Sequence, residues 1–517
     1  MQLGVRRRTR AAAAVAVLVV LVSATACTGS ASDASGGSGS GNGGSFVMAA
    51  FPTGNTMDPW KTQISQYVAQ ATYDTLIHLN ADGTLAPWLA TSWTYTDPKT
   101  LVMRLKTGVT FADGTPFDAD AVVANIEYGK KATPSNFAAL AYLTAISSVQ
   151  AVDATTVRIN LVAPDPDLPY GFSQQAGWMV NPAALKNPSG LTLGADGTGP
   201  YLLDKGATVA NQSYVFTKNP NYWAASQWDR FDKLTVNLIA DPTASDNAAR
   251  SGQINFEIVQ PTTKISGWKT AVGSATALFG FTIFDIKGTI SKPLGDVRVR
   301  QAMNYAIDRK TILSTILGDN GVLNVSTPFG PDSAGYTTAL DDTYTYDPAK
   351  AKALLAEAGY PSGFSLEVLN NPQWDRMAQA LAGYLRAVGV NVTLSNHLSD
   401  LVQQTNSGKW AMGMTLQSVT GLPYTDVSSA MGPAGSLNPL HNNDPKIDSL
   451  LARGASAAAG DQQEIYSELA AYTAAQAWFV VPALTSQLHG YDPKVVKVVE
   501  PKRAGAPALY DLTPAQG

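Results

Sequence analysis

Residues 101–131 read LVMRLKTGVTFADGTPFDADAVVANIEYGKK, and this stretch indicates the fold class of the chain. Apolar and other residues alternate over Leu101–Lys106 before a turn at Thr107, which is the pattern of a half-buried β-strand. Asp118 or Asp120 can then cap a helix that runs to the end of the stretch. A strand followed by a helix is the unit from which α/β folds are built.

The same alternation of strand and helix patterns continues on both sides of this stretch. Further strands are expected at Phe46–Phe51, Val157–Val162, Thr235–Ile239, Leu278–Asp285 and Phe364–Leu369. Further helices are expected at Ser65–Leu79, Val297–Leu317, Pro348–Ala358 and Arg376–Val388. The patterns predict two α/β lobes built on mixed sheets, with residues 270–292 as the crossover between them.

The composition is that of a folded protein with little net charge. The chain has 517 residues, of which 45% are hydrophobic and 15% charged, and its formal net charge is -4. This length and apolar fraction allow a large core divided among roughly two to four domains. Because 36 basic residues face 40 acidic ones, no positive field is available to hold a phosphate backbone, and we expect no nucleic-acid partner.

The few cysteine and histidine residues limit the metal chemistry. A single cysteine rules out an intramolecular disulfide and every multi-cysteine zinc or iron–sulfur site within the chain. No two of the 4 histidines stand at the i, i+4 spacing that places two ligands on one helix face. We therefore expect no metal site and no cofactor.

The first 45 residues have the features of an export signal and a tether. Residues 1–26 join a basic start to an uncharged run that is too short to span a bilayer and ends in small residues, as in a cleaved signal peptide. The segment ATAC that ends at Cys27 resembles a bacterial lipobox, although Ala24 stands where Leu is usual. Residues 27–45 would then be a lipidated cysteine and a flexible Gly/Ser tether. We expect export and lipid anchoring to the outer face of the cytoplasmic membrane; an inert cysteine in a signal peptide cut elsewhere is the alternative.

Known catalytic motifs are missing from the sequence. It contains no GxSxG, HExxH or GxxxxGK[ST] motif, and no SxxK with its partner motifs. A pair of glycosidase carboxylates stays open, because pairing in space is invisible in a sequence. Tryptophan and tyrosine residues on polar, turn-rich segments can wall a pocket for a ligand of mixed character, and core packing is the other interpretation of each. We expect a binding protein and no enzyme.

Several motifs then occur in an order that identifies a family resemblance. They are YDTLIHLNADGTLAPWLATSW at 73–93, LKTGVTFADGTPFDADAV at 105–122, GTGPY at 197–201, KNPNYW at 218–223, SGQIN at 251–255, DVRVRQAMNYAIDRK at 296–310 and YDPAKAKALLAEAGY at 346–360. In this order they resemble the family 5 extracytoplasmic solute-binding proteins of ABC transporters, which include peptide, nickel and oligosaccharide binders. One departure is Ala121, where the family usually has Val. The resemblance runs over residues 46–482.

The resemblance implies an α/β, two-lobed periplasmic-binding-protein-like fold of the large type II form (cluster C), with mixed sheets and a cleft between the lobes. The first lobe would comprise residues 46–286, with a subdomain near 95–195, the second lobe 287–482, and residues 483–517 would return to the first. The lobes would close on a ligand, and a permease would read the closed state. The expected partners are this ligand, ABC permease subunits and, through the N-terminal lipid, the membrane. We expect a monomer.

The resemblance also points to candidate binding residues. In this family the loop at 62–67 faces the cleft, which makes Ser65, Gln66 and Tyr67 candidates. In the peptide binders an aspartate that follows a tryptophan captures the peptide's amino terminus; the corresponding segment LQSVTGLPYTDV, residues 416–427, lacks that tryptophan and the early aspartate. Only Asp426 can serve there, and capping of a helix that starts near Val427 is an equal alternative. The other candidates are polar or aromatic side chains of the second lobe: Trp374, Gln417, Ser418, Thr420 and Tyr424.

Such a pocket is polar but mostly uncharged. This favours a neutral or zwitterionic short peptide, or a sugar-like ligand, over a naked cation. We expect a short peptide ahead of oligosaccharide and metal-chelate ligands. Two functions of other classes stay open: a secreted hydrolase with an unseen carboxylate pair, and a scaffold lipoprotein without transport, whose own side chains would fill the cleft.

Overall fold

The computed structural model describes residues 43–515 except 53–55, 62–63, 132–141 and the single positions 195, 229, 319, 325 and 399. They belong to one compact unit, residues 42–517. The expected signal peptide, Cys27, nearly all of the tether and the first two residues of the expected cleft loop lie outside the described residues. In the part of the chain that is described, no helix combines the length and the apolar character needed to cross a membrane.

Within the described residues, eleven strands form one mixed sheet, and its order is β15-β14-β16-β12-β17-β11-β1-β10-β9-β8, with β13 paired to β17. The strands are β1 Ser45–Ala50, β8 Tyr201–Leu203, β9 Ser213–Lys218, β10 Lys233–Leu238, β11 Phe256–Ile258, β12 Lys269–Ile283, β13 Gly321–Leu323, β14 Phe364–Asn370, β15 Val390–Asn396, β16 Met412–Ser418 and β17 Phe479–Tyr491. β1 runs parallel to β10 and β14 runs parallel to β15, whereas β12 and β17 are antiparallel. The expected α/β class with a mixed sheet is confirmed.

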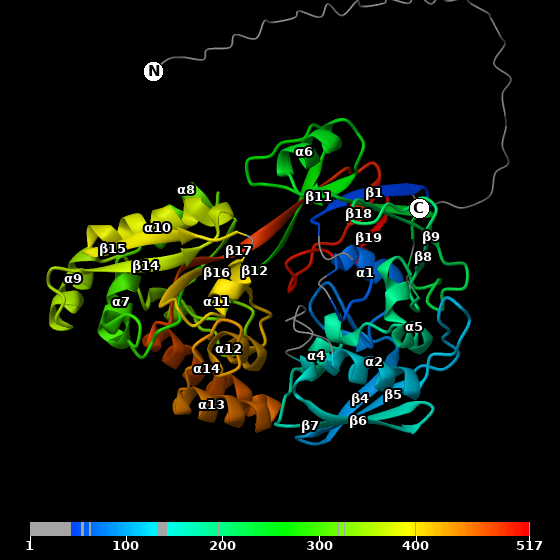
Figure 1. Cartoon of the computed structure of the whole chain (residues 1–517), viewed down its shortest axis with the longest axis horizontal. Coiled ribbons are helices and arrows are strands. Elements are labelled where there is room, and N and C mark those ends of the chain that lie inside the picture. Colours follow the sequence, from blue (N-terminus) through cyan, green and yellow to red (C-terminus); the bar gives the residue numbers. More distant parts are fainter. Residues whose placement is uncertain are drawn as a thin grey trace, which may run out of the picture. The chain divides into compact units, whose positions relative to one another are not determined.

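The two longest strands, β12 and β17, lie next to each other in the middle of this sheet (Figure 1). At one end Lys269 pairs with Tyr491 beside β11, and at the other Thr282 pairs with Phe479 beside β16. The register of the pair shifts between Val272 and Ala275 and again between Ala275 and Ala277. Such irregularities bend and twist a strand pair locally.

Separate apolar cores lie at the two ends of this strand pair. Three core clusters draw on residues 46–268 and 491–512, and two draw on residues 275–484. We call the first group the first lobe and the second group the second lobe. The chain therefore leaves the first lobe through β12 and returns to it through β17. The expected domain boundaries at residues 287 and 482 stay predictions.

The helices follow the amphipathic patterns of the sequence in most places. Those of the first lobe are α1 Gln66–Thr72, α2 Ala119–Lys131, α4 Leu168–Gly171, α5 Pro182–Lys186 and α6 Pro242–Arg250. Those of the second lobe are α7 Val297–Tyr305, α8 Arg309–Ile316, α9 Pro348–Glu357, α10 Asp375–Ala387, α11 Leu401–Thr405, α12 Pro423–Met431, α13 Pro445–Ser456 and α14 Ala459–Gln476.

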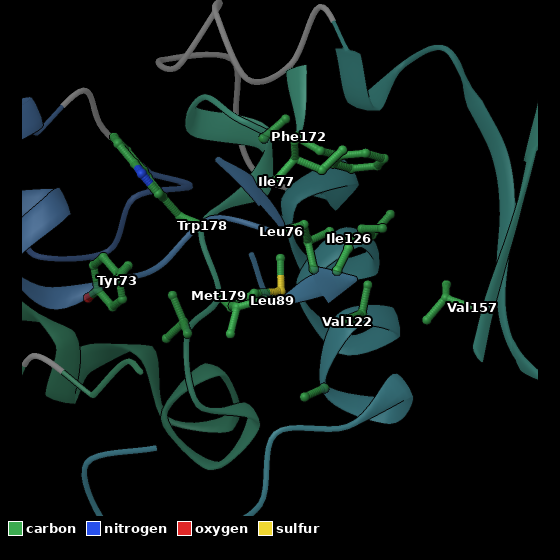
Figure 2. Packing of buried hydrophobic residues seen from close by; sticks show 14 of the residues in the cluster. Tyr73, Leu76, Ile77, Leu89, Val122, Ile126, Val157, Phe172, Trp178 and Met179 are labelled. Atoms are coloured by element: carbon green, nitrogen blue, oxygen red, sulfur yellow. The ribbon is translucent and has the colours of Figure 1, made fainter. Parts of the chain in front are cut away.

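Smaller sheets complete the first lobe. One is antiparallel, in the order β4 Ala90–Asp97, β5 Thr100–Leu105, β7 Thr156–Leu161 and β6 Ile146–Asp153; the others pair β2 Ile77–Leu79 with β3 Leu85–Pro87 and β18 Val496–Val498 with β19 Leu512–Pro514. Helix α2 packs against β6, and its Val122 and Ile126 belong to the same core as Leu76 and Phe172 (Figure 2). Asp118 accepts the N–H of Ala121 at 3.0 Å, so Asp118, and not Asp120, caps this helix.

Two expected helices are wrong in extent. The helix expected over residues 65–79 ends at Thr72, because the chain turns extended at Tyr73 and residues 77–79 form β2. The helix expected over residues 297–317 is two helices, because the side chain of Asp308 accepts the N–H of Thr311 and so begins a new helix as its N-cap.

Candidate ligand site between the lobes

Asp426 lies in the first turn of α12 and organises the loop in front of that helix. Its side chain is 1% exposed, and its carboxylate accepts the N–H of Thr420 at 2.8 Å, the hydroxyl of Thr420 at 2.9 Å and the N–H of Gly421 at 3.0 Å. Burial raises the pKa of Asp426 to about 8, against the effect of these hydrogen bonds, and the charge of Asp167 adds to the rise. Because α12 already begins at Pro423, the expected cap of a helix near Val427 is wrong.

Asp167 of the first lobe makes the polar contact with α12 of the second lobe. Its Oδ2 accepts the N–H of Thr425 at 3.0 Å and the hydroxyl of Thr425 at 2.9 Å. The N-cap residue of α12 is Leu422, whose side chain makes no capping hydrogen bond. Asp167 therefore satisfies an N–H of the first turn from the opposite lobe, as a capping side chain would. Burial raises the pKa of Asp167, and the bonds from Thr425 oppose this rise.

A third carboxylate, Asp165, lies beside Asp167. It is 8% exposed, and its Oδ1 accepts the N–H of Asp167 at 2.9 Å. Burial raises the pKa of Asp165 to about 7, and the charge of Asp167 adds to the rise. Within the described residues, no Lys, Arg or His nitrogen lies within 4.0 Å of any of these three acids. Three acidic side chains therefore lie together between the lobes without a basic partner there.

Tyrosines surround these acids. Burial raises the pKa of Tyr424 to about 12, and the charges of Asp165 and Asp167 add to the rise. The pKa values of Tyr170 and Tyr466 are likewise raised, first by burial and then by nearby acids of the same group. These phenols therefore stay protonated at neutral pH. They give the site aromatic faces together with hydroxyl groups.

The other second-lobe candidates have mixed surroundings. Gln417 donates from Nε2 to Ser429 Oγ at 2.9 Å, and its Oε1 is buried without a hydrogen-bond partner in the described structure. Ser418 ends β16 and is exposed. Trp374 is half-buried and packs edge-on against Phe279, with ring centroids 5.8 Å apart, beside the second-lobe core. The structure thus brings Thr420, Tyr424 and Asp426 together, while the contacts of Trp374 are with its own lobe.

The three first-lobe candidates contact residues of that lobe. Ser65 is the N-cap residue of α1 and is 8% exposed. Gln66 donates from Nε2 to the carbonyl of Pro507 at 3.3 Å. Tyr67 lies in the core, where its ring packs edge-on against Phe256 at 5.8 Å. A binding role for these three residues stays a prediction.

Sequence reasoning missed Asp165 and Asp167. They stand in the segment APDPDLP, residues 163–169, where prolines alternate with acids. Two acids separated by one proline in a loop after a strand are a visible sequence signal, but Thr425, the hydrogen-bond partner of Asp167, lies 258 positions away. Among the described residues, no group of three or more His, Cys, Asp or Glu side chains is arranged to hold a metal ion.

The sequence of this chain matches a known protein family. A model of the bacterial extracellular solute-binding proteins, family 5 (middle region), matches residues 84–438. The chain belongs to this family. As a family 5 solute-binding protein it is the receptor component of an ABC importer and acts outside the cytoplasmic membrane, as expected; the family assignment leaves the solute open.

Two curated relatives come from Escherichia coli (strain K12). The glutathione-binding protein GsiB is 30% identical over 410 residues, which are 76% of this chain and 77% of the relative. The nickel-binding periplasmic protein is 28% identical over 413 residues, which are 73% of this chain and 76% of the relative. Both are binding proteins by name, and they differ in the named ligand.

Solved structures match the fold of this solute-binding protein over nearly its whole length. NikA from Brucella suis, in complex with Fe(III)-EDTA, has a TM-score of 0.78 and 24% identity, and the match covers 91% of this chain and 99% of NikA. DppA from Helicobacter pylori, in complex with the peptide STSA, has a TM-score of 0.77 and 20% identity, covering 92% and 98%. At these identities the likeness establishes the two-lobed fold, which confirms the architecture expected from the sequence.

Proposed function

We propose that this receptor captures a small polar solute that carries a positively charged amino group, with short peptides ahead of other solutes. The amino group would lie between the lobes, beside Asp165, Asp167 and Asp426. The observation that carries the proposal is that these three acids, of which Asp165 and Asp426 are buried and Asp167 is half-buried, have no basic partner within 4.0 Å among the described residues.

Burial of a carboxylate in a site of low polarity is unfavourable, and a raised pKa reports that cost. An ammonium group that enters such a site supplies the missing countercharge and forms charge-assisted hydrogen bonds, which are stronger than neutral ones. The faces of tyrosine rings add a cation–π attraction. Because Asp167 and Thr425 come from opposite lobes, a ligand at this place contacts both lobes and favours the closed state.

The names of similar proteins agree with this ligand class. GsiB is named for glutathione, which is a peptide, and DppA was solved with the peptide STSA. The nickel-binding relative and NikA with Fe(III)-EDTA keep a metal chelate as the competing class. Oligosaccharide remains a third class, and a hydrolase or a non-transporting scaffold is the outcome if no solute binds reversibly.

A binding experiment on the purified protein tests the proposal. Isothermal titration with trialanine, N-acetyl-trialanine, maltotriose and Ni(II)–histidine separates the ligand classes. We expect trialanine to bind, and we expect N-acetylation or Asp167→Asn to weaken binding about tenfold or more, since a hydrogen bond to a charged group is worth about 1.5–3 kcal/mol. Asp120→Asn, an exposed acid in α2, is the matched control and should bind like the wild type. Equal binding of the acetylated peptide, or binding of only the sugar or chelate, contradicts the proposal.

We also propose that Cys27 carries the lipid and that the Gly/Ser segment after it tethers the folded unit, which would function as a monomer. The support is the position of the single cysteine directly after the small residues of the export signal. Cys27→Ser should release the protein from washed membranes, and it should remove metabolically incorporated palmitate. Retention of both in this variant would contradict the anchor.

A further inference from the structure

Asp167 stands at the start of α4, but its side chain does not cap that helix. It is the N-cap residue of α4, and its carboxylate makes no capping hydrogen bond there. Pro169, in the first turn, has no N–H, and the N–H of Tyr170 already donates to the backbone carbonyl of Asp167 at 2.9 Å. The carboxylate of Asp167 is therefore available to another helix.

The first turn of α12 lacks a cap of its own. Its N-cap residue is Leu422, which has no side-chain oxygen, and the next residue is Pro423, which has no N–H. Thr425 of the same turn donates its N–H at 3.0 Å and its hydroxyl at 2.9 Å to Oδ2 of Asp167. Helix α12 of the second lobe thus receives its cap from the N-cap residue of α4 in the first lobe (Figure 1).

The same pair of residue types caps another helix within a single lobe. Asp308 is the N-cap residue of α8, and Thr311 donates its N–H at 3.0 Å and its hydroxyl at 2.7 Å to the two oxygens of that carboxylate. Three positions separate the acid from the threonine there, against 258 positions between Asp167 and Thr425. The α8 cap does not depend on where the lobes are, whereas the α12 cap exists only while the lobes are together.

Thr425 also contacts Tyr142, which packs against the core of the first lobe. Burial raises the pKa of Tyr142, and a hydrogen bond with the side chain of Thr425 opposes this rise. The ring of Tyr142 lies directly against α4, since a Cβ atom on Gly171 would be 2.4 Å from it. Thr425 therefore inserts between two polar groups of the first lobe. By comparison, the hydrogen bond from Arg503 of the first lobe to the carbonyl of Asp332 of the second is 3.5 Å long.

We infer that this cross-lobe cap closes the receptor in part without the solute, and that Thr425 is a positioning residue that holds the lobes ready for capture. In the open form, Asp167 and the first turn of α12 exchange their mutual hydrogen bonds for bonds to water. A hydrogen bond to a charged acceptor is favourable over that exchange, so the closed form gains stability that no ligand supplies. The inference goes beyond the proposed function, because it holds for any solute held by both lobes. The apparent affinity for such a solute rises with the closed fraction of the empty receptor.

The test measures the ratio of closed to open receptor without added solute. The parent is the full exported chain with Cys27→Ser, which removes its single thiol, and with dyes at Gln150→Cys in β6 and Glu464→Cys in α14. Both label positions are exposed, one in each lobe, and native mass spectrometry confirms that no solute has co-purified. By single-molecule energy transfer we expect a closed population in the parent. Thr425→Val deletes the hydroxyl and should lower the closed-to-open ratio about tenfold.

Further variants separate this role from a general loss of stability. Thr425→Ser keeps the hydroxyl and should keep the ratio of the parent, whereas Thr425→Ala should repeat the result of Thr425→Val. Thr311→Val deletes the matched hydroxyl of the α8 cap and should lower the urea midpoint of unfolding without changing the ratio. The inference is overturned by a parent without a closed population, by equal ratios in the parent and Thr425→Val, or by equal losses in Thr425→Val and Thr311→Val. Because no ligand is used, failure of the amine site in calorimetry leaves the inference standing, and failure of the inference leaves the amine site standing.

Discussion

Single buried acids are stabilised in two different ways in this protein. Asp74 is fully buried and accepts hydrogen bonds of 2.9–3.0 Å from five side chains: Trp88, Thr198, Tyr222, Trp223 and Tyr510. These donors come from four separate parts of the first lobe, including its C-terminal return. Asp165, Asp167 and Asp426 accept fewer hydrogen bonds, and their donors are backbone N–H groups and threonine hydroxyls. Burial raises the pKa of all four acids. The hydrogen bonds to Asp74 join separate segments of the first lobe. Asp165, Asp167 and Asp426 lack a positively charged partner, which the proposed ligand would supply.

The structural role of Asp74 predicts a large loss of stability in Asp74→Asn. The amide places two N–H groups where five donors converge, so at least one buried donor loses its acceptor. We expect a loss of about 2–4 kcal/mol in the free energy of unfolding, measured by urea denaturation, since each unsatisfied buried group costs about 1–3 kcal/mol. Asp120→Asn, on the exposed face of α2, should change it by less than about 0.5 kcal/mol. A loss of the same size in both variants would contradict this role.

The buried side chain of His489 should make the folding stability of the protein sensitive to acid. The residue is fully buried on β17, its ring stacks on Phe256 at 5.3 Å, and neither ring nitrogen has a hydrogen-bond partner in the described structure. Burial lowers the pKa of His489 from 6.5 to about 4. The unfolded chain therefore binds the proton more readily than the folded chain between these values, and stability falls as the pH drops through this window.

The test is the pH dependence of unfolding in His489→Phe. The wild type should lose up to about 3 kcal/mol through His489 between pH 6.5 and 4, and the phenylalanine variant should lack this part of the acid loss. His441→Asn changes an exposed histidine and should retain the wild-type slope. If the slopes of the wild type and His489→Phe coincide, the histidine is not the group that titrates.

At the scale of elements, helices and strands were predicted correctly from the sequence where local signals mark their ends. The strand and helix of residues 101–131 were predictable because alternation, a turn and a capping aspartate follow one another in the sequence. The split between α7 and α8 was missed because the residues on both sides pack into one core, which preserves helical spacing across the break. The true signal was Asp308, whose capping role shows only when its contact with Thr311 is known. The site was harder still, because Asp167 and Thr425 meet through tertiary structure.

Substitution of one glycine in β12 and of one glycine in α10 should have opposite effects on stability. Gly273→Ala would place a Cβ atom 2.1 Å from the carbonyl oxygen of Gly505, so β12 and the segment of residues 501–505 would have to separate. We expect a loss of about 1–3 kcal/mol in unfolding free energy, together with faster proteolysis after Lys502 or Arg503. Gly383→Ala lies in α10 with open space around the added atom and should gain about 0.5–1 kcal/mol. Thermal unfolding and limited trypsin digestion measure both, and tolerance of Gly273→Ala would contradict the close approach.

At the scale of the whole molecule, β12 and β17 connect the separate cores of the two lobes. Family motifs predicted this architecture well, because most of them are turns and packing positions inside one lobe. They said little about the ligand, because the acids between the lobes belong to segments that the chain brings together only when both lobes are in place. The expectation of a mostly uncharged pocket therefore missed Asp165 and Asp167.

The protonation state of the acids between the lobes should couple ligand capture to proton release. The pKa of Asp426 is raised to about 8 and that of Asp165 to about 7, so at pH 7 part of the empty receptor carries a proton on these groups. An ammonium group placed beside them favours the ionised carboxylates and lowers their pKa values. Capture of an amine-bearing solute should therefore release protons, and affinity should rise as the pH increases from about 6 to 8. Above that range it should fall again, because an α-amino group loses its own proton near pH 7.7–8.0.

Calorimetry in two buffers that differ in ionisation enthalpy measures this release directly. At pH 7 we expect trialanine to displace up to about one and a half protons per site, since the carboxyls of Asp426 and Asp165 both titrate near that pH. Asp426→Asn should reduce the number, whereas Asp120→Asn should leave it unchanged. Binding heats that are equal in both buffers would mean that the acids are already ionised in the empty receptor. Proton uptake would mean that the solute brings its own negative charge to them, and the amine would then have to lie elsewhere in the cleft.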